Sequence, residues 1–526
     1  MRRDHLTLWI PLTVAGVCLS SCAPAADELP AVSVVDSAGV EMITSATPAW
    51  ELRDRWTASA TPTLEVGAAD GAEEYTLFRV GAVVTLPRDR IAIVNSGTSQ
   101  IRIYGIDGRH IRDVGGQGEG PGEFMALRDL WLTSADSIMT SDSRLSRITL
   151  FDAEGVFGRT ISVSPHGEAL QVFGRRPFDD GSLFVSGVHR PAEGPRQGLF
   201  DGGARVFSRY SSEGVHELTL GELPHPANWG FPMRGSVAYT LAPFTVPSPP
   251  NASDGEFIYL GSGSEPRIEK RDREGRVIRV IRWGATPQPV NGDAIERFRD
   301  ERLNPDAPPE QLEVVSSMLE GLIYPDEMPV FQSLFVDAVG YLWVEQYRAV
   351  RKGPRRWWVF DADGRWLGEP DTPADLDIRE VGEDYLLGVR VDDADVERVV
   401  RYPLTRAGAD SGMYLLAGQR PPPPDVLGIR SLRRRPTLLT MADVSRSLLE
   451  ATSARAAPLS GSSGAPFAGS LGVPGRRPAP QRIGTRYARC VPERLACDAR
   501  DRPLRADRGP GNGVGRVADR ERIRGQ

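Results

Sequence analysis

The chain of 526 residues is poor in cysteine and in lysine. Its four cysteines lie at positions 18, 22, 490 and 497, so the long stretch between 22 and 490 can form neither a disulfide nor a thiolate metal site of its own. Only two of the 63 basic residues are lysine, which is typical of a GC-rich genome and needs no functional explanation. No apolar run reaches the roughly 18 residues that a membrane-spanning helix needs.

Positive charge is scarce in residues 1–420, which carry a net charge of −18, whereas residues 421–526 carry +11. Proteins bind nucleic acid through clustered positive charge, so the acidic main body predicts no nucleic-acid partner. The chain is 40% hydrophobic and 25% charged, with 55 Gly and 43 Pro. This composition indicates a globular protein with many turns and excludes collagen, coiled coil and general disorder.

The N-terminus carries the features of an export signal. Two arginines precede a mostly apolar run of about 14 residues at 6–19, which fits the core of a signal peptide and is too short to span a bilayer. The run ends in the sequence LSSC at 19–22, which resembles the bacterial lipoprotein signal, in which the cysteine receives the lipid and becomes the mature N-terminus. An ordinary secretory signal that happens to precede a cysteine is the alternative.

From this resemblance we expect a signal peptide at 1–21, lipid attachment at Cys22 and a linker at 22–40. The resemblance also implies a location in the cell envelope, anchored to the membrane through the N-terminal lipid alone. Ala23, at the second mature position, is not the aspartate associated with retention in the inner membrane. The outer membrane or the cell surface is therefore the favoured address.

One pattern recurs along the main body: an apolar strand, a polar gap, a second strand ending in an aromatic residue, and an acidic turn with glycine. The clearest copies are IAIVNSGTSQIRIYGIDG at 91–108, SIMTSDSRLSRITLFDAEG at 137–155, FIYLGSGSEPRIEKRDREG at 257–275 and YLWVEQYRAVRKGPRRWWVFDADG at 341–364. Less regular copies cover 183–214 and 385–404. The turn glycines are Gly108, Gly155, Gly214, Gly275 and Gly364. Alternating apolar and polar residues predict half-buried strands, and each glycine supplies the positive φ of a tight hairpin.

About four strands per repeat, repeated six times, predict an all-β fold, a six-bladed β-propeller over residues 41–410. A single blade cannot bury both of its faces, so the ring must close. We expect the strands VEMIT (40–44) and TLEVG (63–67) to complete the last blade.

The segment GGQGEGPGEF at 115–124, followed by a strand and by RITLFDAEG, resembles the NHL repeat. More broadly, residues 33–404 resemble the six-bladed β-propeller lipoproteins of environmental bacteria. The resemblance implies the fold and says almost nothing about activity. The glycines do not indicate a phosphate-binding loop, because no helix is predicted after them.

Two segments depart from the repeat. An insertion at about 291–322 contains two predicted helices, 292–303 and 311–322, with Asn291 and Asp293 as candidate caps of the first. These helices either cover the channel as a lid or pack on a blade edge, and we favour packing. Residues 411–526 are rich in Arg, Pro and Gly and predict a disordered tail, either a basic anchor for anionic lipid or a dispensable extension.

Few residues indicate chemistry. The six histidines show no helical metal-ligand spacing, and no nucleophile elbow is present. Asn95, Asp142 and Glu345 follow inner strands of three blades, where side chains from several blades can meet on the axis and hold a divalent ion. Trp343, Trp357 and Trp358 are predicted to pack between blades, although an exposed edge could stack on a sugar.

The favoured function is therefore a monomeric binding or scaffold module that presents its loops to a protein, peptide or glycan. The sequence requires no cofactor. The alternative is a metal-dependent propeller enzyme of lactonase-like or lyase-like type. Acidic turns such as DADGRW at 361–366 resemble the Asp box of sialidases but are explained more simply as hairpin turns.

Overall fold

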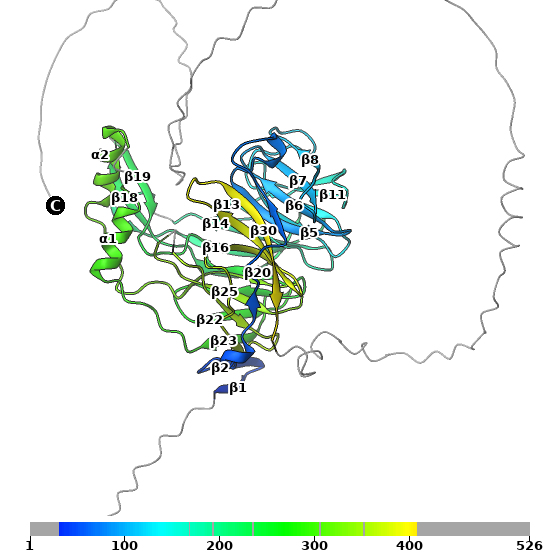
Figure 1. Cartoon of the computed structure of the whole chain (residues 1–526). Helices are drawn as coiled ribbons and strands as arrows, with labels where there is room; N and C mark the ends of the chain where they lie inside the picture. Colours follow the sequence, from blue (N-terminus) through cyan, green and yellow to red (C-terminus); the bar gives the residue numbers. More distant parts are fainter. Residues whose placement is uncertain are drawn as a thin grey trace, which may run out of the picture. The chain divides into compact units, whose positions relative to one another are not determined.

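The computed structural model describes residues 31–407, apart from 168, 192–193, 234–235, 304–306 and 351–352. The signal peptide, Cys22 and the tail at 411–526 lie outside the described residues, as do Cys490 and Cys497. The described chain forms seven sheets, many of whose strands are labelled in Figure 1. Six of them are consecutive blades of a ring, because the hydrophobic clusters join each blade to the next and the last blade to the first. The prediction of a six-bladed β-propeller is therefore confirmed.

Each of the first three blades has four strands. Blade 1 consists of β5 (Val80–Leu86), β6 (Arg90–Asn95), β7 (Gln100–Gly105) and β8 (His110–Gly115). Blade 2 consists of β9 (Leu127–Leu132), β10 (Ile138–Asp142), β11 (Arg147–Phe151) and β12 (Phe157–Ser162). Blade 3 consists of β13 (Ala169–Gly174), β14 (Leu183–His189), β16 (Ala204–Tyr210) and β17 (His216–Pro224).

Two of the last three blades, blades 4 and 6, also receive strands from the N-terminus. Blade 4 consists of β20 (Asn251–Ser253), β21 (Ile258–Leu260), β22 (Arg267–Arg271) and β23 (Val277–Trp283), and β2 (Val40–Ser45) and β1 (Val32–Ser37) extend it. Blade 5 consists of β24 (Phe331–Val336), β25 (Leu342–Gln346), β26 (Trp357–Phe360) and β27 (Trp366–Gly368). Blade 6 consists of β28 (Asp377–Val381), β29 (Tyr385–Val391) and β30 (Glu397–Thr405), completed by β3 (Thr57–Ala58) and β4 (Leu64–Val66).

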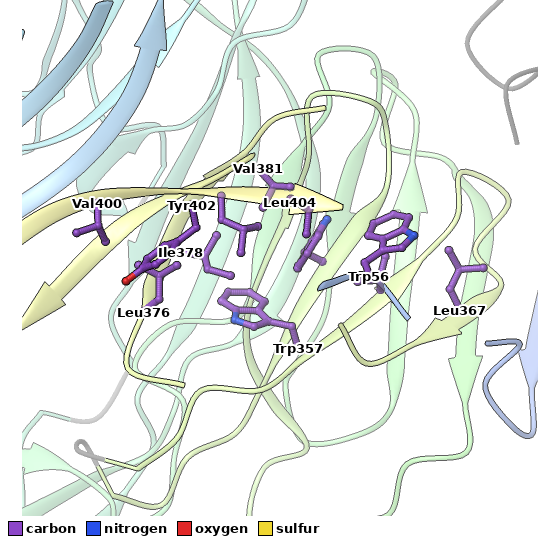
Figure 2. Packing of buried hydrophobic residues seen from close by; sticks show 12 residues of the cluster. Trp56, Trp357, Leu367, Leu376, Ile378, Val381, Val400, Tyr402 and Leu404 are labelled. Atoms are coloured by element: carbon purple, nitrogen blue, oxygen red, sulfur yellow. The ribbon is translucent and has the colours of Figure 1, made fainter. Parts of the chain in front are cut away.

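The hydrophobic core is divided among the six interfaces between consecutive blades. One cluster, for example, packs Ile103 of blade 1 together with Leu130 and Ile138 of blade 2. Another joins blade 5 to blade 6, and its buried side chains lie between the two sheets (Figure 2). The sheets bury their apolar faces against one another, so the stability of each blade depends on both of its neighbours.

The five predicted turn glycines all adopt positive φ, between +78° and +85°. They share a second property that the sequence does not reveal. Each lies in the hairpin between the third and fourth strands of its repeat, and a Cβ atom there would approach a strand of the preceding blade. At Gly275 the added carbon would lie 2.9 Å from the Leu220 carbonyl oxygen and 3.0 Å from its Cα atom. The glycines are therefore contacts between blades as well as turns.

Gly275→Ala is expected to lower the free energy of unfolding by about 2 kcal/mol, because alanine is strained at positive φ and its methyl group meets the Leu220 backbone. Urea denaturation measures this change. Gly181→Ala is the matched control, since Gly181 also has positive φ (+84°) but a Cβ atom there has open space around it. Equal stability of the two variants would contradict the proposed role of the glycine as an interblade contact.

The segment 31–66, which we call the N-terminal strap, runs along the outer edges of blades 4, 5 and 6. Strand β2 pairs in parallel with β23 of blade 4, with Ile43 opposite Ile281. The amides of Ala49 and Trp50 then donate to the carbonyls of Trp366 and Leu367 in blade 5, at 3.0 and 2.7 Å. A short 3₁₀ helix, η1 (Leu52–Asp54), precedes β3 and β4, which both pair with β30 of blade 6.

Two strands of the strap were predicted to complete the last blade, and the structure confirms this for one of them only. TLEVG contains β4 and completes blade 6, as expected. VEMIT was expected there too, and this was wrong: it forms β2 and extends blade 4, where the free edge of β23 accepts it. Strand β1 lies within the segment 22–40 that was assigned to a linker, so this part of the assignment was wrong.

The helical insertion forms α1 (Gly292–Asp300) and α2 (Pro309–Leu319) between blades 4 and 5. Asn291 caps α1, its side chain accepting from the Ala294 amide at 2.9 Å. The helices share a small core with Phe244, and α2 contacts β18 (Asn228–Met233). Strand β18 belongs to a sheet outside the six blades, so packing of the helices on a blade edge stays a prediction.

Beside the helices lies a sheet that the sequence analysis did not identify. It consists of β15 (Gly198–Phe200), β18 (Asn228–Met233) and β19 (Ser236–Leu241) (Figure 1). The other short helix is η2 (Glu73–Tyr75), which lies just before blade 1.

Candidate functional site

The three candidate metal ligands lie at equivalent places, at the ends of β6, β10 and β25, and all are buried. Asn95 is held by two local hydrogen bonds. Its Oδ1 atom accepts from the Phe78 amide at 2.7 Å, and its Nδ2 atom donates to the Thr98 hydroxyl at 3.0 Å. Both ends of the amide are thus used to fasten the loop that enters blade 1.

Asp142 accepts four backbone amides. Its Oδ2 atom binds Met125 and Ala126 at 2.6 and 3.0 Å, and its Oδ1 atom binds Arg144 and Leu145 at 2.9 and 3.0 Å. A carboxylate with this many donors is well compensated for its burial. Its geometry is that of an anchor for the loop between blades 1 and 2.

Glu345 lies in a buried charge cluster. Its carboxylate accepts from the Ser333 hydroxyl at 2.8 Å and from Arg355 at 2.5 Å, and the Arg348 Nε atom lies 3.4 Å away. Arg355 also pairs with Asp377 of blade 6 at 2.8 Å. The cluster therefore links blade 5 to blade 6.

Each of these three side chains thus makes contacts within its own part of the ring. In the segments that the structure describes, no three side chains of His, Cys, Asp and Glu form a group that could hold a metal ion. The acidic turn at 361–366 is an ordinary hairpin, in which Asp361 accepts the amides of Asp363 and Arg365 at 3.0 and 2.9 Å.

The glycine-rich segment 115–124 forms a loop between blades, with no helix after it. Arg147 of β11 fastens it, donating to the carbonyls of Glu119, Gly120 and Glu123 at 2.9, 2.9 and 2.6 Å. Arg102 does the same for the loop before blade 1, through the carbonyls of Glu73 and Thr76. The recurring arginine in the third strand of a blade was a sequence signal for this role.

The three tryptophans are buried, as expected. Trp343 and Trp357 belong to the core between blades 5 and 6, and Trp358 belongs to the core between blades 4 and 5. None of these rings has a face available for a sugar.

Two histidines stack on each other. The rings of His166, before blade 3, and His216, in β17, are 3.6 Å apart and nearly parallel, and Tyr210 packs edge-on against His216. Burial and the neighbouring His166 lower the pKa of His216. The Nε2 atom of His216 is buried without a hydrogen-bond partner, so the neutral ring suits this position.

This stack predicts a loss of stability on acidification. A histidine whose pKa is lowered on folding binds its proton more readily in the unfolded chain, so its neutral form favours the fold above about pH 6.5 and this contribution is lost as pH falls. Thermal unfolding between pH 7.5 and 5.5 should show a smaller decrease in midpoint for His216→Phe than for the natural protein. Identical pH profiles would contradict this assignment.

The surface between blades 3 and 4 contains a pocket of about 330 Å³. Seven of its eight lining residues are charged: Asp180, Arg209, Glu256, Asp272, Arg273, Glu274 and Arg276, with Phe257 as the eighth. They come from hairpins and strand ends that are distant in the sequence, which is why the repeat pattern does not reveal them. We call this feature the blade 3/4 pocket.

The charges of the blade 3/4 pocket are paired with one another. Arg273 binds Asp180 at 2.8 Å, and Arg209 binds Glu217 at 2.9 Å while lying 3.8 Å from Asp180 and 4.0 Å from Glu274. Burial opposes the ionisation of Asp180, but hydrogen bonds from Ser182 and the charge of Arg273 outweigh it and lower its pKa to about 2. Asp180 is thus ionised at neutral pH, as its pair with Arg273 requires.

Comparisons with known proteins agree with the fold. Residues 72–166 match a family described as "6-bladed beta-propeller". No functionally curated protein shows significant sequence similarity to the chain.

Several solved structures are similar at low sequence identity. A protein of Bacteroides fragilis thought to be exported is 13% identical, with 69% of this chain and 99% of that chain covered, at a TM-score of 0.40. A duf4221 family member from Bacteroides vulgatus is 12% identical, with 68% of this chain and 100% of that chain covered, at a TM-score of 0.39. A gluconolactonase of Xanthomonas campestris is 12% identical, with 62% of this chain and 87% of that chain covered, at a TM-score of 0.33. Similarities of this size carry no information on activity.

Across the described ranges, no helix combines the length and the apolar character needed to cross a membrane. The order of the sheets, the six cores between them and the matched segment agree with one another. The chain is a six-bladed β-propeller whose last three blades are bound together by its own N-terminus.

Proposed function

We propose that the protein is an exported β-propeller, anchored in the cell envelope through a lipid on Cys22, that acts as a binding or scaffold module. We further propose that the blade 3/4 pocket takes a charged segment of a protein or peptide. The pocket, with its dense and balanced charge, is the observation that carries this proposal.

Ion pairs near the surface contribute little to stability, commonly less than about 1 kcal/mol each. A partner that brings its own carboxylates and guanidinium groups can therefore replace the pairs of Arg209 and Arg273 with Asp180 at low cost. The same charges select against partners with the wrong pattern, since an unmatched charge is left without a counterion.

A protein or peptide suits this pocket better than a neutral glycan. Sugars stack on exposed aromatic faces, and the tryptophans considered for that role are buried. Phe257 is the single aromatic ring among the residues that line the pocket. The proposed address in the envelope comes from the sequence, through the lipoprotein-like LSSC at 19–22.

The test is capture of partners by the full-length protein from detergent-solubilised native envelope. The double variant Arg209→Ala/Arg273→Ala should retain a partner roughly tenfold less well, a loss of about 1.4 kcal/mol in binding free energy, and retention should fall with added salt. Arg88→Ala, at an exposed pair with Glu154 on another blade, is the control. Partners that bind the double variant as well as the natural protein would exclude the pocket as their site.

A metal-dependent enzyme is distinguished by thermal unfolding in EDTA and then with Ca²⁺ or Zn²⁺. An ion at about 100 times its dissociation constant adds about 2.7 kcal/mol of stability, which raises the midpoint measurably. We expect no saturable rise. A saturable rise in the unfolding midpoint with one ion would contradict the proposal. The ligands of that ion would have to be residues other than Asn95, Asp142 and Glu345, which are buried and already hydrogen-bonded.

A further inference from the structure

Strand β1 is the outermost strand of the extended blade 4. Its inner edge pairs with β2 through six registered residues, from Val32 opposite Ser45 to Ser37 opposite Val40. Val34 and Val35 are 52% and 57% exposed. Successive residues of a strand point to opposite faces, so both faces of the hairpin are uncovered at this point.

The hairpin is attached to the blade at fixed points. Strand β2 forms a parallel ladder with β23 from Glu41 to Ser45. Arg279 of β23 also donates to the Glu41 carboxylate at 2.5 Å and to the Ala362 carbonyl of blade 5 at 2.8 Å. These contacts fix the orientation of β1 relative to blade 4, so β1 forms the outer edge of that blade.

The chain between this hairpin and the proposed lipid is short. Cys22 precedes Ala31, the first described residue, by nine residues. A fully extended chain spans at most about 3.3–3.6 Å per residue, so Val32 at the start of β1, ten residues from Cys22, cannot lie more than about 36 Å from the lipidated cysteine. No other blade begins this close to Cys22 along the chain. Blade 1 lies opposite blade 4 in the ring of six blades, so it is the natural comparison.

We infer that the outer edge of blade 4, formed by the β1–β2 hairpin, is the side of the propeller that faces the phospholipid bilayer. This inference rests on the proposed lipid anchor at Cys22. The exposed valines suit the boundary between headgroups and acyl chains. Among the described residues, no strand pairs with the outer edge of β1. The backbone groups of this edge need polar partners, so the edge lies at the interface and does not enter the hydrocarbon.

The test places a fluorescent donor on the lipidated full-length protein, with Cys490 and Cys497 replaced by serine, and an energy acceptor on the headgroups of reconstituted phospholipid vesicles. Val35→Cys and Ile111→Cys give matched labels, because Ile111 of β8 is 51% exposed on blade 1. The inference predicts higher energy transfer from position 35 than from position 111. Insertion of about 20 Gly/Ser residues before Asp27 should narrow the difference, because it lengthens the tether.

Equal transfer from the two positions, or higher transfer from position 111, would overturn the inference. Equal transfer together with disulfide cross-linking between Val35→Cys copies would assign the edge to a second copy of the chain. Incorporation of labelled palmitate separates these results from failure of the proposed anchor. A natural protein that takes up no label, or a Cys22→Ala variant that takes up as much label as the natural protein, would contradict the anchor itself.

Discussion

Val66→Asp is expected to lower the free energy of unfolding by about 4 kcal/mol or more, because it places a charge in the joint that closes the ring. Val66 is buried on β4, in the core between blade 6 and blade 1. Val66 lies opposite Val399 of β30, so the charge would also disturb the pairing between β4 and β30 that completes blade 6. Urea denaturation followed by circular dichroism measures the change.

Glu65→Gln on the same strand is the control. Glu65 points away from this core and pairs with Arg398 at 3.1 Å near the surface, so its loss should cost less than about 1 kcal/mol. If Val66→Asp cannot be recovered folded, Val66→Ala tests the same joint with an expected loss of about 2 kcal/mol. A stability of either Val66 variant equal to that of Glu65→Gln would show that β4 is dispensable for closure.

Arg406→Ala is expected to cost about 3–5 kcal/mol, the loss typical of breaking a buried ion pair. Arg406 follows the last strand and binds Asp337 of blade 5 at 2.8 Å, with side chains 9% and 0% exposed. It also donates to the Gly382 and Glu383 carbonyls, and its guanidinium lies 4.2 Å from the Trp56 ring centroid. One side chain thus joins blade 5, blade 6 and the strap.

Arg53→Ala provides the comparison, since its pair with Glu51 is 79% and 69% exposed and should contribute almost nothing. Arg406→Lys should restore only part of the stability, because one ammonium cannot reproduce the planar set of donors that reaches Asp337 and two carbonyls. Thermal unfolding of the three variants side by side measures these differences. Full rescue by lysine would mean that charge alone accounts for the effect.

The repeats were predictable because hairpin chemistry is local. Strand alternation and the acidic turn with glycine lie within about twenty residues of each other, as at Gly155 and Gly275. Counting the copies of this strand-and-turn pattern also predicted the number of blades. The course of the strap was not predictable in full, because VEMIT and TLEVG show the same alternation and nothing nearby selects β23 or β30 as partner.

The candidate site illustrates the same limit. Polar residues at the ends of inner strands are equally compatible with a metal site and with loop anchors, and only the four amides around Asp142 distinguish the two. The blade 3/4 pocket joins Asp180 to Arg273, which are 93 residues apart. No spacing rule predicts such a pair, since it depends on how two sheets pack.

The path of the strap also has a consequence for the order of folding. Its residues are the first of the described chain to be synthesised, yet Thr57 pairs with Thr405, near the end of blade 6. Contacts between residues so distant in sequence form slowly, because a long loop must be ordered before they are made. The ring therefore cannot close until blades 4, 5 and 6 have all emerged, and until then the strand edges of the strap are unpaired and exposed to aggregation or to a chaperone.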